Sequence, residues 1–290
     1  MKWFSEQHKE HGLIKAQSLG ARLPEILLDA QRIAMTLRTG AHGRRKVGAG
    51  DHFWQYRAYD PSADSSARID WRQSAKSHQL YVREQEDERA QTAYIWIDPS
   101  ASMHFTSDAA YRTKYEYAFL LGCVLAYQLT QASERVGVLS ESGEACIIDH
   151  PKQVERLAAT MMALPDTLDF SVPAKSKLII VSDFLSFNYN LLDSFIESKI
   201  QNNVSFLVVS PYDVKEYNYD YAGHVKFENM QQSDTFEIQD AQLLKENYQR
   251  KFSQHLEALD AIFGRDQIIR FATDQPALET ALKVTQRLIL

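Results

Sequence analysis

The chain has 290 residues, of which 44% are hydrophobic and 24% are charged, so it can bury a core; this excludes wholesale disorder, collagen and small disulfide scaffolds. The formal net charge of -6 argues against a nucleic-acid-binding surface over the whole chain. Cys123 and Cys146 each lie in an apolar run, so we expect buried free thiols in a reducing compartment. They form no CxxC pair, so zinc or redox chemistry is not indicated. We find neither a secretory signal nor a membrane segment and therefore expect a cytoplasmic protein.

Residues 1–90 are expected to form an N-terminal helix and a small segment that contains β-strands. Apolar side chains recur at helical spacing over residues 23–37, and Pro24 suits a first helical turn. The aromatic-rich stretch 52–59 favours a strand, and residues 79–84 favour a second one.

Residues 91–290 alternate short apolar runs with longer helical patterns, which predicts a second domain. The expected strands are 92–98, 135–140, 144–149, 177–183, 204–210 and 267–271, and the expected helices are 111–131, 151–163, 190–200, 240–263 and one from residue 276 onward. Residues 212–238 show no clear pattern, and edge strands are their expected content. Continuous apolar strands between helices indicate a mostly parallel sheet covered on both faces, so we expect a doubly wound, Rossmann-like α/β fold.

Two acidic residues end strands of this expected sheet. Asp98 opens the sequence Asp-Pro-Ser-Ala-Ser, which contributes Ser100 and Ser102, and Asp183 ends the strand 177–183. Ligands of open parallel sheets bind beyond the carboxyl ends of the strands. Carboxylate and hydroxyl oxygens suit Mg²⁺, Mn²⁺ or Ca²⁺, and two neighbouring strands would let both acids serve one ion. The alternative is that the serines cap a following helix and no metal binds.

A second group of candidates surrounds Trp71. Arg68, Asp70 and Arg72 belong there to a dense mixed-charge patch. Because Arg and Trp are frequent at interaction hot spots, the patch is a candidate docking surface; an internal ion-pair network that fastens this segment to the main domain is the alternative. His104, just beyond the serine motif, could line the site, or could be a solvated loop histidine.

Four sequence blocks together resemble a known bacterial family. These blocks are IDWRQSAK, the downstream VREQE, IDPSASM and IIVSDF. They are similar to the bacterial "domain of unknown function 58" family over residues 35–290. The resemblance implies a von Willebrand factor A-like domain with a metal-ion-dependent adhesion site. It also implies work with a MoxR-type AAA+ ATPase in assembling or maturing other proteins.

The resemblance assigns roles to individual residues. Asp98, Ser100 and Ser102 match the first motif of the adhesion site, and Asp183 matches the acid of its third motif. Thr167 is the only candidate for the middle-motif threonine after the preceding helix, but its segment is shorter than the usual loop and helix. The resemblance therefore implies a divalent-metal site, for Mg²⁺ or else Mn²⁺ or Ca²⁺, and this departure from the family pattern predicts that it is incomplete, weak or vestigial.

Three functions agree with these patterns, and we rank them in this order. The first is a non-enzymatic interaction module whose divalent ion is completed by an acidic residue of a protein partner. The second is a Mg²⁺-dependent phosphohydrolase or phosphotransferase with Asp98 as nucleophile, although such enzymes usually carry a second carboxylate where Ser100 stands here. The third is a metal-free assembly factor.

Overall fold

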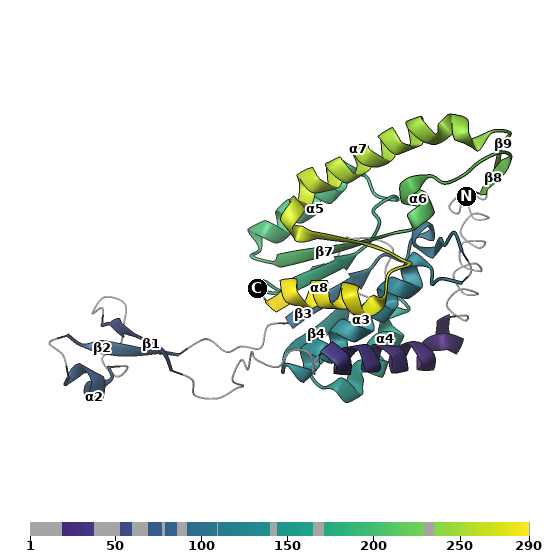
Figure 1. Ribbon diagram of the computed structural model, residues 1–290. Coiled ribbons are helices and arrows are strands. Elements are labelled where there is room, and N and C mark those ends of the chain that lie inside the picture. The colour runs from purple at the N-terminus through teal and green to yellow at the C-terminus, as the bar shows by residue number, and fades with distance from the viewer. Residues whose placement is uncertain are drawn as a thin grey trace. The chain divides into compact units, whose positions relative to one another are not determined.

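The computed structural model describes residues 19–37, 53–59, 69–76, 79–85, 92–108, 110–139, 144–164, 171–228 and 235–289 (Figure 1). Its contacts divide these residues into two compact units. Those between 43 and 90 form a small unit, and all the others form a larger one. Within the described residues, no helix is both long and apolar enough to cross a membrane.

The larger unit is built on a six-stranded sheet whose strand order is β10-β7-β6-β3-β4-β5. The strands are β3 (Thr92–Ile97), β4 (Arg135–Leu139), β5 (Ala145–Ile148), β6 (Lys177–Val181), β7 (Ser205–Tyr212) and β10 (Ile268–Ala272). All neighbouring pairs are parallel except β4 and β5, which form an antiparallel hairpin. The expected mostly parallel α/β sheet is therefore confirmed.

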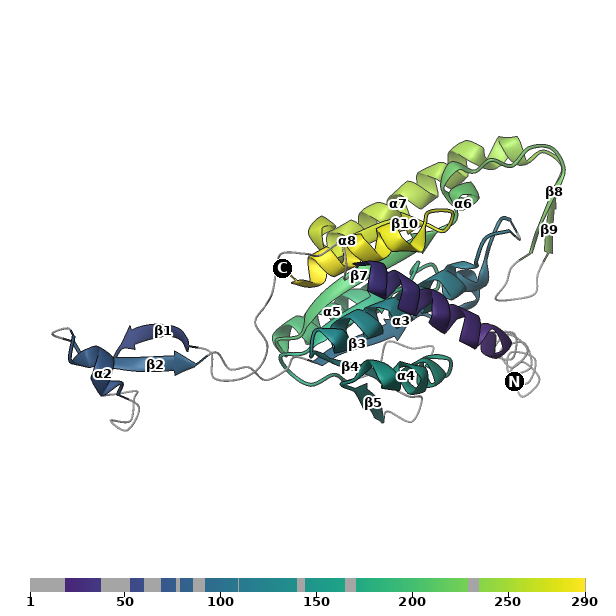
Figure 2. The same cartoon turned by 60° about the horizontal axis from the view of Figure 1, so that its bottom comes forward.

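Helices cover both faces of this sheet. They are α3 (Lys114–Gln131), α4 (Val154–Met161), α5 (Tyr189–Gln201), α7 (Lys245–Phe263), α8 (Ala277–Ile289) and a helix over residues 19–37. Figures 1 and 2 show α5 and α7 on one face, and α3, α4, α8 and the helix of residues 19–37 on the other. Because both faces are covered, the central strands are apolar almost throughout.

Helix α3 is the most deeply buried of these helices, and Gly122 allows its close packing. A Cβ atom on Gly122 would lie 2.6 Å from Cε of Met161 on α4 and 3.1 Å from Cδ1 of Ile97 on β3. The helix begins with a capping box in which Thr113 accepts from the backbone N–H of Glu116, while the Glu116 carboxylate accepts from that of Thr113. Its first residue, Lys114, is thereby fixed in position at the carboxyl-terminal edge of the sheet.

The helix of residues 19–37, which the sequence analysis grouped with residues 1–90, contributes to the core of the larger unit. Ile26, Ala30 and Ala34 on this helix are completely buried. The side chain of Asp29 also pairs with Arg112 at 2.6 Å, just before α3.

The stretch 212–238 differs from its expected content. It holds α6 (Val214–Asn218) and two short strands, β8 (Val225–Glu228) and β9 (Thr235–Ile238). These strands pair with each other in a separate antiparallel sheet, so they are not edge strands of the main sheet. Short 3-10 turns, η2 (Ala101–His104), η3 (Pro151–Gln153), η4 (Ala241–Leu244) and η5 (Arg265–Gln267), complete the larger unit.

In the small unit, the described residues form two antiparallel strands and one short helix. The strands are β1 (Phe53–Ala58) and β2 (Tyr81–Gln85), and the helix is α2 (Trp71–Ser74). Both expected strands are thus present. The Oγ of Ser74 accepts from the N–H of Tyr81 at 2.9 Å, which ties α2 to β2.

Candidate functional site

Three adjacent strands of the main sheet are each followed by a buried acid at the same edge. Asp98 follows β3, Asp183 lies two residues after β6, and Asp213 follows β7. The strands are parallel neighbours in the order β7-β6-β3, so their carboxyl ends meet at one edge. The backbone N–H of Asp98 donates to the carbonyl of Val181 at 2.9 Å, which holds the ends of β3 and β6 together. This edge is where open α/β sheets bind ligands.

Asp98 is completely buried, and both of its carboxylate oxygens accept hydrogen bonds. Oδ1 accepts from the backbone N–H of Ser100 at 2.8 Å, and Oδ2 accepts from the hydroxyl of Ser182 at 2.6 Å. Burial raises the pKa of Asp98 from 3.8 to about 6; the hydrogen bond from Ser182 opposes this rise, and the charge of Asp183 adds to it. Ionising Asp98 in the folded protein is therefore unfavourable.

The two serines and Asp183 form a continuous row of oxygen atoms. The hydroxyl oxygens of Ser100 and Ser102 lie 3.1 Å apart, and the Ser102 hydroxyl donates to Oδ1 of Asp183 at 3.0 Å. Ser100 occupies the N-cap position of η2, but its side chain makes no capping hydrogen bond there. The capping alternative therefore does not account for the placement of the Ser100 hydroxyl.

A buried lysine, which was not among the expected site residues, completes this cluster. The Nζ atom of Lys114 lies 2.8 Å from Oδ2 of Asp183 and 2.8 Å from each carboxylate oxygen of Glu216 on α6. Its side chain is 0% exposed. Burial alone would lower the pKa of Lys114, but the carboxylates of Asp183 and Glu216 outweigh burial and raise it, so the lysine is a cation. Burial raises the pKa of Glu216, although Lys114 opposes that rise.

The turn after β6 fixes the orientation of Asp183. Its Oδ1 also accepts from the backbone N–H of Leu185 at 3.0 Å. Phe184 adopts a left-handed backbone conformation with φ of 57°, and its N–H donates to the hydroxyl of Ser182 at 2.8 Å. The ring of Phe184 is buried, so the turn is anchored in the core. Strained non-glycine residues of this kind gather at functional sites.

A histidine on α7 holds the backbone of the same turn. Nε2 of His255 lies 2.9 Å from the carbonyl oxygen of Asp183, and Nδ1 lies 2.7 Å from the hydroxyl of Tyr189. Because a carbonyl only accepts, Nε2 carries the proton, and the Tyr189 hydroxyl donates to Nδ1. Burial lowers the pKa of His255, which keeps its ring neutral.

The remaining acid, Asp213, joins α6 to the loop after η2. Its Oδ1 accepts from the N–H of Lys215, and its Oδ2 accepts from the N–H of Ser107 at 2.9 Å. Asp213 and Glu216 form the capping box of α6. The spacing Asp213-x-x-Glu216 was the only sequence signal for this role, and it lies in the stretch whose pattern was unclear.

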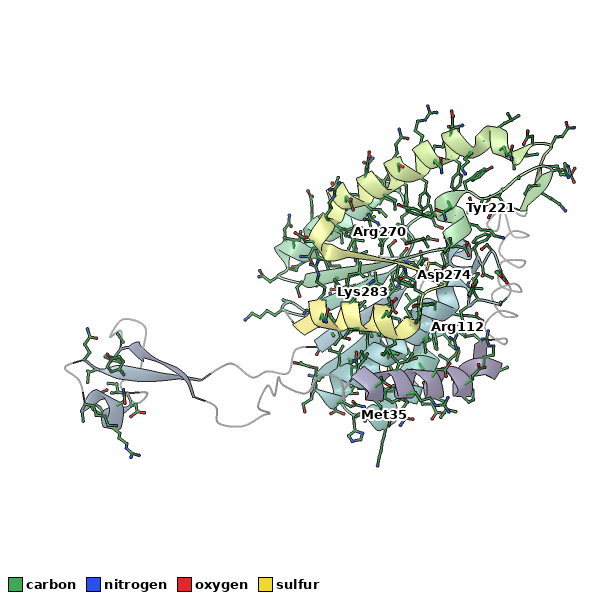
Figure 3. The ribbon with its side chains drawn as sticks, viewed as in Figure 1. Met35, Arg112, Tyr221, Arg270, Asp274 and Lys283 are labelled. Atoms are coloured by element: carbon green, nitrogen blue, oxygen red, sulfur yellow. The ribbon has the colours of Figure 1, made fainter. Side chains whose placement is uncertain are left out.

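An open apolar groove begins beside Glu216. It has a volume of about 430 Å³ and is lined mainly by Phe105, three tyrosines, Ile238 and Leu244. One of these tyrosines, Tyr221, is labelled in Figure 3, at the same end of the unit as α6. Glu216 lines this groove and also pairs with Lys114, so the groove adjoins the acidic cluster.

The other predicted residues have different surroundings. The half-buried His104 packs against Tyr115 with the two rings tilted and their centroids 4.7 Å apart. In the small unit, Asp70 caps α2 by accepting from the N–H of Gln73, while Trp71 is 64% exposed and Arg72 is exposed. The predictions for Thr167 and Arg68 lie outside the described residues.

The spacing of the oxygen row, which is that of its hydrogen bonds, is also compatible with a divalent ion. Mg²⁺ binds oxygen at about 2.1 Å in octahedral geometry, so adjacent ligands lie about 3.0 Å apart. The separations from Ser100 to Ser102 and from Ser102 to Asp183 are 3.1 and 3.0 Å. Lys114 forms an ion pair with Asp183 at the end of this row. Among the described residues, no cluster of three or more His, Cys, Asp or Glu side chains could hold a metal, so hydroxyls must contribute to any such site.

Comparisons with known proteins identify a family. The model of the family described as "Protein of unknown function DUF58" matches residues 55–258. No curated protein matches. Two similar solved structures are the conserved hypothetical protein BatB from Bacteroides thetaiotaomicron and an aerotolerance-related membrane protein from Bacteroides fragilis. Identity to BatB is 10% with a TM-score of 0.36, over 69% of this chain and 100% of that one. For the second structure these values are 12% and 0.33, over 69% and 98%.

Proposed function

Since the chain belongs to the DUF58 family, we propose that it is a non-enzymatic protein-interaction module whose sheet-edge site binds a divalent cation. A carboxylate of a protein partner completes the coordination of this ion. Ser100, Ser102 and Asp183 would hold the ion directly, Asp98 would serve it through a water molecule, and Thr167 would be a further ligand. The family resemblance of the sequence suggests a MoxR-type AAA+ ATPase as the partner, in assembly or maturation of other proteins.

One observation supports this proposal above all others. The hydroxyls of Ser100 and Ser102 and Oδ1 of Asp183 stand in a row at the spacing of adjacent ligands of a magnesium ion. The row lies at the carboxyl edge of two neighbouring parallel strands, and the serines are only partly buried. A bound ion would supply charge that attracts a carboxylate from solution. The chain's own oxygens would fix the place where that carboxylate docks.

The surface beside the site also suits protein recognition. The groove next to Glu216 presents tyrosine and phenylalanine side chains, which are enriched in protein interfaces. His104 and Tyr189 lie on the segments that follow Ser102 and Asp183, so they are candidates for contacts with the partner.

The phosphohydrolase alternative is less well supported. A nucleophilic Asp98 would need a carboxylate oxygen directed at the substrate. Asp98 is instead completely buried, with Ser100 and Ser182 bonded to its two oxygens. Its surroundings suit an acid that orders the loop and supports an ion.

The metal-free alternative has one specific observation in its favour. Lys114 already places a positive charge 2.8 Å from Asp183 and from Glu216, which offsets part of the repulsion among the buried acids. A protein of this kind could use the same edge to bind its partner without an ion. Metal binding must therefore be measured before partner binding.

The test is calorimetry with Mg²⁺ and Mn²⁺ on the full chain, comparing the wild type with Ser102→Ala and with the control Ser194→Ala. Ser194 is an exposed residue of α5 whose hydroxyl donates to the carbonyl of Asn190. We expect one saturable site, weakened at least about tenfold by Ser102→Ala and unchanged by the control. Absence of saturable binding in the wild type, together with partner binding that EDTA does not affect, would leave the metal-free module as the function.

Partner binding is tested next, with a purified MoxR-type ATPase from the same source. We expect Mg²⁺-dependent binding that is lost in EDTA and in Ser102→Ala, and retained in Ser194→Ala. Binding that EDTA does not affect would refute the role of the ion, and absence of binding to the ATPase would refute the choice of partner.

A further inference from the structure

We propose that Lys114 is a built-in cation that keeps the site's affinity for free divalent ions low, so that retention of the ion depends on the negative charge of a partner. This inference rests on the proposed function. It adds a regulatory role for a residue outside the oxygen row.

The contacts of Lys114 show that its charge acts on the site directly. Its Nζ atom is 2.8 Å from Oδ2 of Asp183, whose Oδ1 is the last oxygen of the row. A divalent ion on Oδ1 would therefore share one carboxylate with an ammonium group. Two cations on one carboxylate repel each other, and the repulsion is strong because water is largely excluded there.

The lysine is held in this position from several sides. Its backbone N–H donates to the carbonyl of Phe105 at 3.2 Å, and Nζ lies 5.8 Å from the centre of the Phe105 ring. Glu216 accepts from Nζ with both carboxylate oxygens, and Asp183 faces Nζ from the end of β6. Because the side chain is fully buried, the ammonium group of Lys114 has no contact with solvent beside Asp183.

Glu216 has the opposite electrostatic effect. Glu216 is the second carboxylate that pairs with Lys114, so its negative charge offsets part of the effect of the ammonium charge on Asp183. It also adds negative charge no farther from Asp183 than twice the 2.8 Å contact. Neutralising Glu216 should therefore weaken ion binding, whereas neutralising Lys114 should strengthen it. A purely structural role predicts weaker binding in both cases.

The experiment measures Mn²⁺ binding to the full chain by calorimetry, at about pH 8 so that the carboxylates stay ionised. Lys114→Met should bind Mn²⁺ at least about tenfold more tightly than the wild type, and Glu216→Gln several-fold more weakly, as a change of one unit charge at this range implies. The matched controls are Lys215→Met and Glu246→Gln, which change the same charges at exposed positions on α6 and α7 and should leave the affinity unchanged. Circular dichroism and thermal unfolding confirm that each variant is folded.

The outcomes separate this inference from the proposed function. If the folded variants bind Mn²⁺ but Lys114→Met and Glu216→Gln do not change the affinity in opposite directions, the role of Lys114 is overturned and the proposed function stays intact. Binding by Lys114→Met but not by the wild type supports the inference. If Lys114→Met does not fold, Glu216→Gln decides alone, because unchanged or tighter binding overturns the inference. No binding by any variant overturns both.

Discussion

The buried carboxyl of Asp98 should reduce stability, and removing its charge should stabilise the protein. Asp98→Asn keeps the shape of the side chain and its contacts. The amide oxygen can accept from the N–H of Ser100, and the amide nitrogen can donate to the Ser182 hydroxyl, which now donates to Oδ2; the buried hydroxyl proton then loses this acceptor, at a cost that does not depend on pH. The main change is therefore the loss of a negative charge from a fully buried position.

The magnitude follows from the pKa. Burial raises the pKa of Asp98 from 3.8 to about 6, so the folded protein binds this proton more tightly than the unfolded chain does. Its contribution to stability is full below about pH 3.8 and is lost as the pH rises through 6. A rise of this size corresponds to a loss of about 3 kcal/mol above pH 6. The stability of D98N relative to the wild type should grow by about that amount over the same range.

The assay is urea unfolding of both proteins at several pH values, without divalent ions. We expect the stability of D98N relative to the wild type to rise by about 3 kcal/mol between pH 4 and pH 7 to 8. A difference that does not vary with pH, or a D98N that becomes relatively less stable as the pH rises, would refute the reasoning. If the protein becomes more stable when Asp98→Asn removes the charge and keeps the shape of the side chain, Asp98 is a residue retained for function rather than for folding.

Three further predictions concern other buried groups. Because burial lowers the pKa of His255, its contribution to stability is full above about pH 6.5 and declines as the pH falls below that value; urea unfolding at pH 5 and pH 7.5 should show a smaller decline for His255→Gln. Gly137→Ala should lower the free energy of unfolding by about 1–3 kcal/mol, because the new Cβ would lie 2.7 Å from the ring of Tyr94; an unchanged urea midpoint would contradict this close contact. Burial raises the pKa of Cys123 to about 12, so a thiol reagent should label only Cys146 in the native protein, and equal rates for both thiols would disprove the packing of α3.

The sheet could be predicted because its strands carry their own signal. Residues 92–97 and 177–181 are apolar almost throughout, as strands covered on both faces are, and each is followed within two residues by an acid. The placement of Asp98 and Asp183 at one edge follows from parallel pairing alone. Local patterns were therefore sufficient for the fold class, whereas the oxygen row also depends on β3 and β6 being neighbours, which the sequence left open.

The rest of the site depends on contacts that local patterns do not encode. Lys114 and Glu216 are 102 positions apart in the chain, and only the packing of α3 and α6 at the sheet edge brings them together. A lysine at the start of a helix is normally exposed to solvent, so the adjacent sequence does not indicate that Lys114 is buried. The stretch 212–238 lacked periodicity because its helix and strands are very short.

The order of segments along the chain has a practical consequence. A recombinant fragment that starts at β3 would omit the helix of residues 19–37, although that helix fills part of the core with Ile26, Ala30 and Ala34. Removing the helix would expose apolar surface and leave Arg112 without the carboxylate of Asp29. Such a fragment should precipitate or oligomerise, whereas one that keeps the helix should stay monodisperse. Truncation studies should therefore excise the small unit from within and leave both flanking stretches of chain in place.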